Sequence, residues 1–144
     1  MKPLFDHEKL DVYQEAIAFC GWVGGFLDKI SGKTAARDQL DRASTSIPLN
    51  IAERNGKFSA RDRPRFIEIA RGSVLECAAS LDVLVARRFT TMEDVRAAKE
   101  HLVRLVQMLV GMLRRFSERA DVLREDEGSF GIEHEHDYEQ EHDQ

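Results

Sequence analysis

The chain has 144 residues, of which 42% are apolar and 33% are charged, and its net charge is -5. This length and composition are typical of one water-soluble domain with a hydrophobic core. No run approaches the roughly 18 uncharged apolar residues of a membrane span, and the amino terminus, MKPLFDHEKLD, lacks the apolar segment of a signal peptide. We therefore expect a cytoplasmic protein with no membrane-spanning segment.

The charge is unevenly distributed along the chain. Residues 125–144 hold nine of the 26 acidic residues and none of the 21 basic ones, which leaves 17 acidic and 21 basic residues in 1–124. A body of +4 is therefore joined to a segment of -9. Because so acidic and weakly hydrophobic a segment buries too little surface to offset its ordering entropy, we predict a folded domain over 1–124 and a disordered acidic tail over 125–144.

Two helices are predicted in the first part of the chain. The first covers about residues 10–31 and the second about 34–54, where Asn55-Gly56 is typical of a helix end. Pro48 removes one backbone hydrogen bond from the second helix, so a kink is predicted after Ser44. The apolar stripe predicted for the first helix follows a heptad spacing, with two further apolar residues, Phe26 and Ile30, beside it. The residues in heptad spacing are Leu10, Tyr13, Ile17, Cys20, Gly24 and Leu27.

Two longer helices follow. Ser59-Ala60-Arg61-Asp62 is similar to a capping box and predicts the start of the third helix, and Thr90-Thr91-Met92-Glu93 is a capping box for the fourth. The residues that the third helix is predicted to turn inward are Phe66, Ala70, Ser73, Cys77, Leu81 and Leu84. The strict apolar heptad of the fourth helix consists of Val95, Ala98, Leu102, Leu105, Leu109, Met112 and Phe116.

Four helices with short connections and no strand pattern predict an all-α fold, an antiparallel up-down four-helix bundle. The fourth helix is apolar over more of its circumference than one bundle core needs, and a symmetric oligomer would cover the surplus. The second apolar stripe, which we predict to be an oligomer interface, consists of Val103, Val106, Val110 and Leu113.

The second helix carries a polar seam beside its apolar face, at Gln39, Ala43, Ser46, Asn50 and Glu53. A buried polar group without a partner costs about 1–3 kcal/mol, so the seam should be matched across the bundle. Carboxylates placed there could serve acid–base or metal chemistry, but we favour a structural network that fixes the register of the helices. The predicted members of the network are Asn50, Glu53, Arg71, Ser73 and Glu76.

The cysteine and histidine patterns predict no disulfide and no metal centre. Cys20 and Cys77 lie on apolar helical patterns, far apart and outside any CxxC motif, so buried thiols are expected. A di-iron bundle would need Glu-x-x-His on facing helices, a spacing that occurs in the predicted tail alone, as at Glu139 and His142. We therefore expect neither a metal nor a cofactor.

The connection between the second and third helices is strongly basic. Residues 54–71 contain six basic and two acidic residues, a net charge of +4 within 18 residues. Clustered cations bind nucleic-acid phosphates, because each neutralised phosphate releases counterions and adds salt-dependent affinity. The alternative is a solvated helix start with ion pairs to Asp62 and Glu68. The predicted nucleic-acid-binding residues are Arg54, Lys57, Arg61, Arg63 and Arg65.

Arg96 and His101 form an Arg-x4-His pair, which resembles the motif of some all-helical ribonucleases. In such an enzyme His101 would act as the base or acid, and Arg96 would stabilise the scissile phosphate. A chain with 15 arginines and five histidines is expected to contain an arginine and a histidine at such a spacing by chance. We therefore favour two exposed residues near a helix start and predict no catalytic residues.

The hairpin sequence QLDRASTSIPLNIAER, the S-x-x-D after it, and RFIEIARGSVLEC, together with the entry FDHEKLDVYQEA, resemble a known family. This is the four-helix-bundle family encoded in intervening sequences of bacterial 23S ribosomal RNA genes, and the resemblance covers residues 5–116. The same family includes the accessory proteins of diversity-generating retroelements, which form homopentameric barrels and bind a reverse transcriptase and nucleic acid. The family usually has glycine where this chain has Arg54, so the hairpin turn departs from the family pattern.

These features predict a non-catalytic homo-oligomer, a pentamer by resemblance, that binds RNA or DNA or acts as a ribonucleoprotein accessory factor. The first alternative is a protein-interaction scaffold for a reverse transcriptase or another protein partner, in which the arginines only solvate the surface. The second alternative is an RNA nuclease that uses Arg96 and His101.

Overall fold

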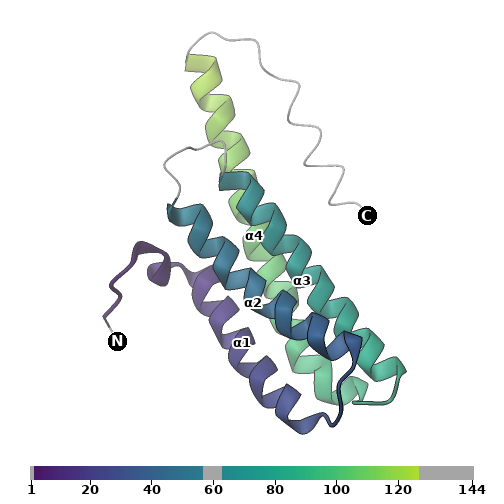
Figure 1. Ribbon diagram of the computed structural model, residues 1–144. Helices are drawn as coiled ribbons and strands as arrows, with labels where there is room; N and C mark the ends of the chain where they lie inside the picture. Colours follow the sequence, from purple (N-terminus) through teal and green to yellow (C-terminus); the bar gives the residue numbers. More distant parts are fainter. Residues whose placement is uncertain (1, 57–62, 127–144) are drawn as a thin grey trace. The chain divides into compact units, whose positions relative to one another are not determined.

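The computed structural model describes residues 2–56 and 63–126 of the chain. Over these residues the protein is all-α, as predicted, with four α-helices that run antiparallel to their neighbours (Figure 1). The elements are the 3-10 helix η1 (Asp6–Lys9) and the helices α1 (Asp11–Lys29), α2 (Ala35–Gly56), α3 (Arg63–Ala86) and α4 (Met92–Asp126). None of the described helices combines the length and the apolar character needed to cross a membrane. The capping box predicted at 59–62 and the tail from 127 onward lie outside the described residues, so the predicted domain boundary stays a prediction.

The chain divides into two compact units within α4, after Val110. The first unit holds η1, α1, α2, α3 and the amino-terminal part of α4, and the second holds α4 from Gly111 onward. Within the first unit α2 packs mainly on α3 and also on α1, while η1 contacts both α1 and α2. The hairpin formed by α2 and α3 carries the polar seam and the basic segment, so it positions most of the predicted site residues.

Threonine hydroxyls begin two of the helices. The Oγ1 of Thr34 accepts a hydrogen bond from the backbone N–H of Arg37 at 3.1 Å, and the Oγ1 of Thr91 accepts one from the N–H of Asp94 at 3.2 Å. Each bond satisfies a backbone donor that the first helical turn leaves without a partner. The predicted capping box of α4 is wrong by one position, because Thr91 rather than Thr90 is the cap residue.

The buried face of α1 differs from the predicted one. Its buried residues are Val12, Ala16, Phe19, Val23, Phe26 and Leu27. Of the predicted heptad, Ile17 is 46% exposed, Gly24 is also exposed, and Leu27 alone is buried, whereas Phe26 and Ile30 beside the heptad are both buried. Apolar residues occupy most of the circumference of α1, so two stripes satisfy the helical period. The stripe with two phenylalanines faces the core because it removes more apolar surface from water.

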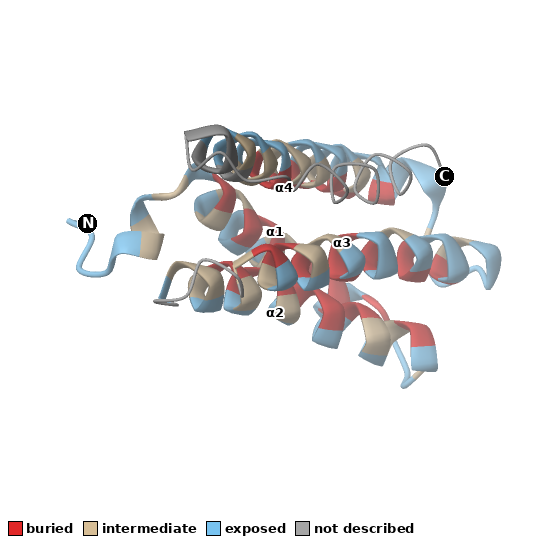
Figure 2. Cartoon of the chain, turned by 90° about the horizontal axis from the view of Figure 1, so that it is seen from above, coloured by how far each residue is buried: buried red, intermediate tan, exposed pale blue. Residues whose placement is uncertain are grey.

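The predicted inward faces of α3 and α4 are confirmed. The predicted residues of α3 from Ala70 to Leu84 are buried, and Phe66 is half-buried. In α4 the heptad is buried from Val95 to Met112, and Phe116 is half-buried. Figure 2 shows the buried residues of α1, α2 and α3 on the sides of these helices that face one another. The apolar periodicity of the two longest helices therefore predicted their packing directly.

Pro48 lies buried in the interior of α2, and the helix continues through it from Ala35 to Gly56. A proline has no N–H, so the carbonyl oxygen of Ser44, one turn earlier, loses its usual helical donor. The thiol of Cys20 on α1 donates to that oxygen, with an Sγ–O distance of 3.2 Å. Cys20 therefore satisfies, from the neighbouring helix, the acceptor that the proline leaves open.

Candidate functional site

The polar seam of α2 meets α3 through serine hydroxyls. The Ser73 hydroxyl donates to the Oγ of Ser46 at 2.9 Å, which joins α3 to α2. The side-chain amide of Asn50 donates to the carbonyl oxygen and the Oγ of Ser46, at 2.8 and 3.0 Å. Ser73 is buried and the other two residues are half-buried, so these bonds replace the water that burial removes.

A second part of the network lies nearer the amino-terminal end of α2. The side-chain amide of Gln39 donates to the Glu76 carboxylate of α3 at 2.6 Å. Two further residues were predicted to belong to the network. Arg71 pairs with Glu68 of its own helix at 3.2 Å, and Glu53, near the carboxyl-terminal end of α2, is exposed. In the described residues no buried side-chain nitrogen or oxygen lacks a hydrogen-bond partner. The contacts of this seam therefore fit a structural network that sets the register of α2 on α3.

The described residues of the basic segment lie at one end of the α2–α3 hairpin. Arg54 is in the last turn of α2, and Arg63 and Arg65 are in the first turn of α3. Because the two helices pack antiparallel, these positions come to the same end of the hairpin. Arg65 is exposed, whereas Arg54 and Arg63 are half-buried. Lys57 and Arg61 lie outside the described residues.

One group of polar side chains was not predicted. The Glu15 carboxylate of α1 accepts hydrogen bonds from two residues of α4, His101 Nδ1 at 2.6 Å and Arg104 Nε at 3.2 Å. The Nη2 of Arg104 lies 3.1 Å from the same His101 nitrogen. The ring of Phe19 lies beside the imidazole, with the centroids 6.5 Å apart. These residues form the Glu15–His101–Arg104 cluster. The three-residue spacing of its histidine and arginine was the only sequence signal, since Glu15 is 86 positions from His101.

The geometry of the cluster fixes the tautomer of His101. A carboxylate only accepts hydrogen bonds, so the proton is assigned to the Nδ1 that lies 2.6 Å from Glu15, and Arg104, which only donates, makes no hydrogen bond to that nitrogen. Nε2 makes no hydrogen bond with the described residues, and no buried nitrogen among them lacks a partner, so Nε2 reaches solvent. A carboxylate that orients an imidazole can support proton transfer, and a neighbouring arginine can bind an oxyanion.

Opposing effects act on the Glu15 carboxylate. Burial by itself raises its pKa, but the hydrogen bonds from His101 and Arg104 and the charges of both residues outweigh burial, so the pKa of Glu15 lies below its ordinary 4.5. A carboxyl group with a lower pKa in the folded state stabilises the fold above its ordinary pKa. That contribution is lost as the pH falls through the lowered value. At neutral pH the Glu15 carboxylate is therefore ionised, and its hydrogen bonds to His101 and Arg104 join α1 to α4.

Replacement of Glu15 by glutamine is expected to lower the free energy of unfolding by about 1–2 kcal/mol at neutral pH, because charge-assisted hydrogen bonds to a partly buried carboxylate are lost. The difference from the wild type should shrink as the pH falls below 4.5, where the wild-type Glu15 takes up a proton. Urea denaturation followed by circular dichroism at several pH values measures both effects.

Asp6→Asn is the matched control for this substitution. The ion pair of Asp6 with Lys9 at 3.6 Å lies at the surface, with the Asp6 side chain 87% exposed. Exposed pairs contribute little, so the control should change the unfolding free energy by less than about 0.5 kcal/mol. Equal losses in the two variants, or a Glu15→Gln loss that persists at acid pH, would contradict the assigned role of Glu15.

Arg96 is not part of this cluster. It pairs with Glu100 at 3.9 Å, and its side chain is 83% exposed. Two side chains five positions apart on an α-helix point about 140° away from each other, so Arg96 and His101 lie on different sides of α4. The structure surrounds His101 with Glu15 and Arg104, and it does not bring Arg96 to the imidazole.

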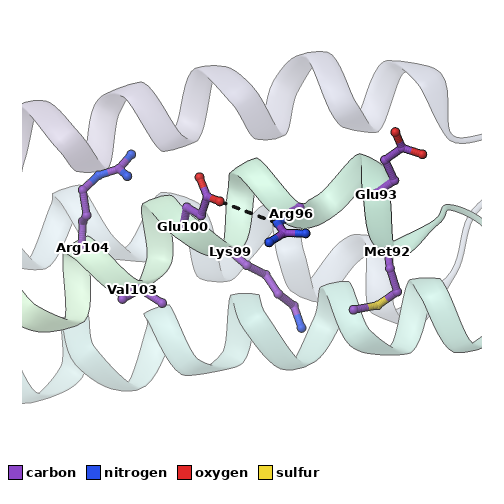
Figure 3. Close-up of a pocket in the computed structure, with 7 residues that line it drawn as sticks. All are labelled: Met92, Glu93, Arg96, Lys99, Glu100, Val103 and Arg104. Carbon is purple, nitrogen blue, oxygen red and sulfur yellow. Dashed lines mark ion pairs between the residues drawn. The ribbon is translucent and has the colours of Figure 1, made fainter.

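The exposed face of α4 forms a shallow, open groove with a volume of about 880 Å³ (Figure 3). Its described lining residues are Met92, Glu93, Arg96, Lys99, Glu100, Val103 and Arg104. Lys99 pairs with Asp82 of α3, and Arg104 pairs with Glu15 of α1 at 3.2 Å. The groove therefore lies along α4. Two of its lining residues form ion pairs with neighbouring helices, Lys99 with α3 and Arg104 with α1.

The residues of the predicted oligomer interface differ in exposure. Val103 is 55% exposed, Val106 and Val110 are half-buried, and Leu113 is buried. Of these four residues Val103 is therefore the most exposed, and Met92 at the amino-terminal end of the same helix is 59% exposed.

Histidine, cysteine and carboxylate side chains do not gather into a metal centre in the described part of the chain. Cys20 and Cys77 are both free thiols, with Cys77 buried and Cys20 half-buried. The histidines of the predicted tail lie outside the described residues. The polar groups of the described candidate sites are therefore hydroxyls, amides, carboxylates, an imidazole and guanidinium groups.

The antiparallel helices and the polar α2–α3 hairpin place the protein in the class of small all-helical bundle proteins. Residues 8–111 match the model of the 23S rRNA-intervening sequence protein family, and the chain belongs to that family. The match spans α1, α2, α3 and the part of α4 that lies in the first unit.

One solved structure with a similar fold is a protein of unknown function from the S23 ribosomal protein family of Bacteroides thetaiotaomicron VPI-5482. Its sequence is 19% identical, the TM-score is 0.67, and the alignment covers 71% of this chain and 97% of that chain. At this identity the likeness shows the fold alone. A search of curated proteins gave no match.

Proposed function

We propose that the protein is a non-catalytic, homo-oligomeric bundle of the bacterial cytoplasm that binds RNA through the basic end of the α2–α3 hairpin. The observation that supports this most is the gathering of cations there. Arg54 ends α2, Arg63 and Arg65 begin α3, and Lys57 and Arg61 belong to the connection between them. Five cations within residues 54–65 suit the closely spaced phosphates of a nucleic acid.

The family to which the chain belongs also favours RNA as the nucleic acid. The family is named for an intervening sequence of 23S rRNA, and the solved structure of similar fold is described as a member of a ribosomal protein family. The resemblance of the hairpin to retroelement accessory proteins extends the proposal. The RNA-binding surface would then act in a ribonucleoprotein that contains a reverse transcriptase.

The full chain is expected to bind single-stranded RNA with an affinity that falls steeply as salt increases. The triple variant Arg61→Ala/Arg63→Ala/Arg65→Ala should lose at least about tenfold in affinity, and its logarithmic salt slope should decrease by about 2, because about three phosphate contacts are lost. Fluorescence anisotropy with a labelled RNA at several salt concentrations measures both quantities, and a DNA of the same sequence tests the choice of RNA.

A matched triple variant, Lys29→Ala/Lys33→Ala/Arg87→Ala, removes the same charge from exposed positions at the opposite end of the first unit. Its affinity for RNA should stay close to that of the wild type. Equal losses in the two triple variants would mean that total charge rather than the hairpin end determines binding, and they would overturn the proposal.

The labelled RNA is expected to remain intact in this assay, because the structure does not bring Arg96 to His101. RNA cleavage by the wild type that is lost in His101→Ala would overturn the non-catalytic part of the proposal. The Glu15–His101–Arg104 cluster, rather than the Arg96–His101 pair, would then be the catalytic group.

A protein-interaction scaffold is the second candidate function, and one observation favours it. On α2, Leu49 is 60% exposed and lines a shallow groove of about 340 Å³ together with polar residues such as Arg42 and Asn50. The exposed leucine side chain offers apolar surface that a protein partner can bury, and the polar groups beside it offer hydrogen bonds. An interaction with a protein partner that survives high salt and the arginine substitutions would favour this alternative.

A further inference from the structure

We infer that a pocket between α1 and the connection from α3 to α4 binds a guanine mononucleotide. The pocket has a volume of about 400 Å³, within the range of about 300–1,000 Å³ that is usual for pockets that hold one small molecule. Its described lining residues all belong to the first unit, at the end opposite the basic end of the α2–α3 hairpin. The inference therefore adds a second ligand and does not depend on RNA binding.

Apolar side chains form the inner wall of the pocket. Phe26 and Ile30 are buried there, and Trp22 stacks on Phe26 with the ring centroids 4.6 Å apart. Phe19 stacks on Trp22 from the other side along the helix, so both faces of the indole are covered and its edge lines the pocket. The indole N–H makes no hydrogen bond with the described residues, and no buried nitrogen among them lacks a partner, so this donor is accessible.

Phe89 offers a free aromatic face at the pocket. It is 39% exposed and makes no ring contact with the other described aromatic residues. The N–H of Phe89 donates to the Leu84 carbonyl oxygen and the N–H of Arg88 donates to that of Val85, both at 3.0 Å. With a φ of 67° at Arg88, these bonds form the Schellman motif that ends α3. The backbone that carries the ring is therefore fixed beside the pocket, where a planar base can stack on it.

Two side chains of opposite charge line the pocket from different helices. Lys29 lies in the last turn of α1 and Asp94 in the first turn of α4, and both are exposed. Neither side chain forms a hydrogen bond or an ion pair with another residue in the described part of the chain. An ammonium group only donates hydrogen bonds and a carboxylate only accepts them. A ligand that satisfies both therefore carries an anionic group and a group with hydrogen-bond donors, and the apolar wall suits a ring between them.

A guanine mononucleotide has this combination of groups. The N1–H and the N2 amino group of guanine are adjacent donors, and a single carboxylate such as that of Asp94 can accept both. The ring stacks on Phe89, and the phosphate pairs with Lys29. Adenine presents one amino group beside an acceptor nitrogen. That nitrogen would face a carboxylate oxygen without a proton between them, so the pocket favours guanine.

The two charges also argue against simpler ligands. An anion without hydrogen-bond donors would be repelled by Asp94, and a cation would be repelled by Lys29. An uncharged apolar molecule would remove both charged groups from water without giving them partners. A nucleotide supplies a partner for each charge and a flat surface for the aromatic ring.

Titration of the full chain with guanosine monophosphate (GMP), followed by the fluorescence of Trp22, tests the pocket. Trp22 is the only tryptophan of the chain, so the signal comes from the pocket itself. GMP is expected to give a saturable change with a dissociation constant below about 1 mM. Adenosine monophosphate (AMP) and free phenylalanine, which lack the paired ring donors, should bind at least about tenfold more weakly.

Asp94→Asn should weaken GMP binding at least about tenfold and remove the preference for GMP over AMP, because the amide accepts only one of the two guanine hydrogen bonds. Glu93→Gln is the matched control. It removes a charge from the same turn of α4, but Glu93 does not line this pocket. The control should bind GMP like the wild type, and both variants should keep the circular dichroism spectrum of the wild type.

Two glycines of α1 allow the pocket to be filled. Gly25 lines the pocket and Gly24 does not, and nothing lies within 4 Å of a Cβ atom added at either position. Both Gly25→Leu and Gly24→Leu should therefore fold, with melting temperatures no lower than that of the wild type, since glycine is unfavourable inside a helix. Gly25→Leu alone should lose GMP binding, because its side chain occupies the space of the ligand.

The two proposed ligands are tested separately. Lys29→Ala should lose at least about tenfold in affinity for GMP and keep the affinity for RNA, whereas the triple arginine variant of the hairpin should bind GMP like the wild type. A wild type without a saturable response to GMP would overturn the inference and leave RNA binding unaffected. Equal affinity for AMP or phenylalanine, or equal losses in the two members of either matched pair, would also overturn it.

Discussion

Phe19→Ala is expected to lower the free energy of unfolding by about 3–5 kcal/mol. Phe19 has 0% of its surface exposed, its ring stacks on Trp22 with the centroids 6.2 Å apart, and it lies beside the imidazole of His101. Truncation to alanine removes this burial and leaves a cavity under the Glu15–His101–Arg104 cluster. Because single domains are stable by only about 5–15 kcal/mol, the variant should unfold at a far lower urea concentration.

Ile17→Ala is the matched control, because it truncates a large apolar residue only two positions away. Ile17 lies on the stripe that the heptad spacing predicted to be buried, yet it is 46% exposed. Its truncation should cost less than about 1 kcal/mol. Urea denaturation of both variants thus decides which face of α1 packs on the core. If Ile17→Ala lowered the free energy of unfolding more than Phe19→Ala, the predicted heptad stripe rather than the Phe19 stripe would face the core.

The contrast between α1 and α4 shows when an apolar pattern predicts a buried face. In α4 charged residues such as Arg96 and Arg104 border the second apolar stripe, whereas the heptad from Val95 to Met112 is apolar throughout, so the heptad is the stripe that packs on the core. In α1 the segment AIAFCGWVGGFL has no charge at all, and the helical period alone allows two faces. Packing against the other helices selects between them, and that information is not local to α1.

Part of the site could not be predicted because it depends on contacts between residues that lie far apart in the sequence. The polar seam was visible because its residues share one helix face, and its partner Ser73 followed from the same kind of pattern on α3. Two contacts carried no such pattern: the Cys20 thiol on the Ser44 carbonyl, and the Glu15 carboxylate on His101. Both depend on how α1 is rotated about its axis, which was the part of the fold predicted incorrectly.

Cys77 is expected to react with a thiol reagent at least about a thousandfold more slowly in the folded protein than in the unfolded chain at mildly alkaline pH. Cys77 is 0% exposed on α3. Burial, with smaller contributions from the charges of Cys20 and Glu76, raises the pKa of its thiol from the ordinary 9.0 to about 12. Only the thiolate reacts, and its fraction falls about tenfold for each unit of pKa, so the pKa alone accounts for the expected factor.

The thiol of Cys20 supplies a comparison within the same chain. It is half-buried, its pKa is raised by burial and by the charge of Asp41, and it donates to the Ser44 carbonyl. Its reaction should therefore be slower than in the unfolded chain and faster than that of Cys77.

Two single-cysteine variants separate the two reactions. Cys20→Ser, which keeps a donor for the Ser44 carbonyl, reports on Cys77 alone, and Cys77→Ala reports on Cys20 alone. In guanidinium the two variants should react at equal rates. A folded-state rate for Cys77 that matches the rate for Cys20 would contradict the burial of this face of α3.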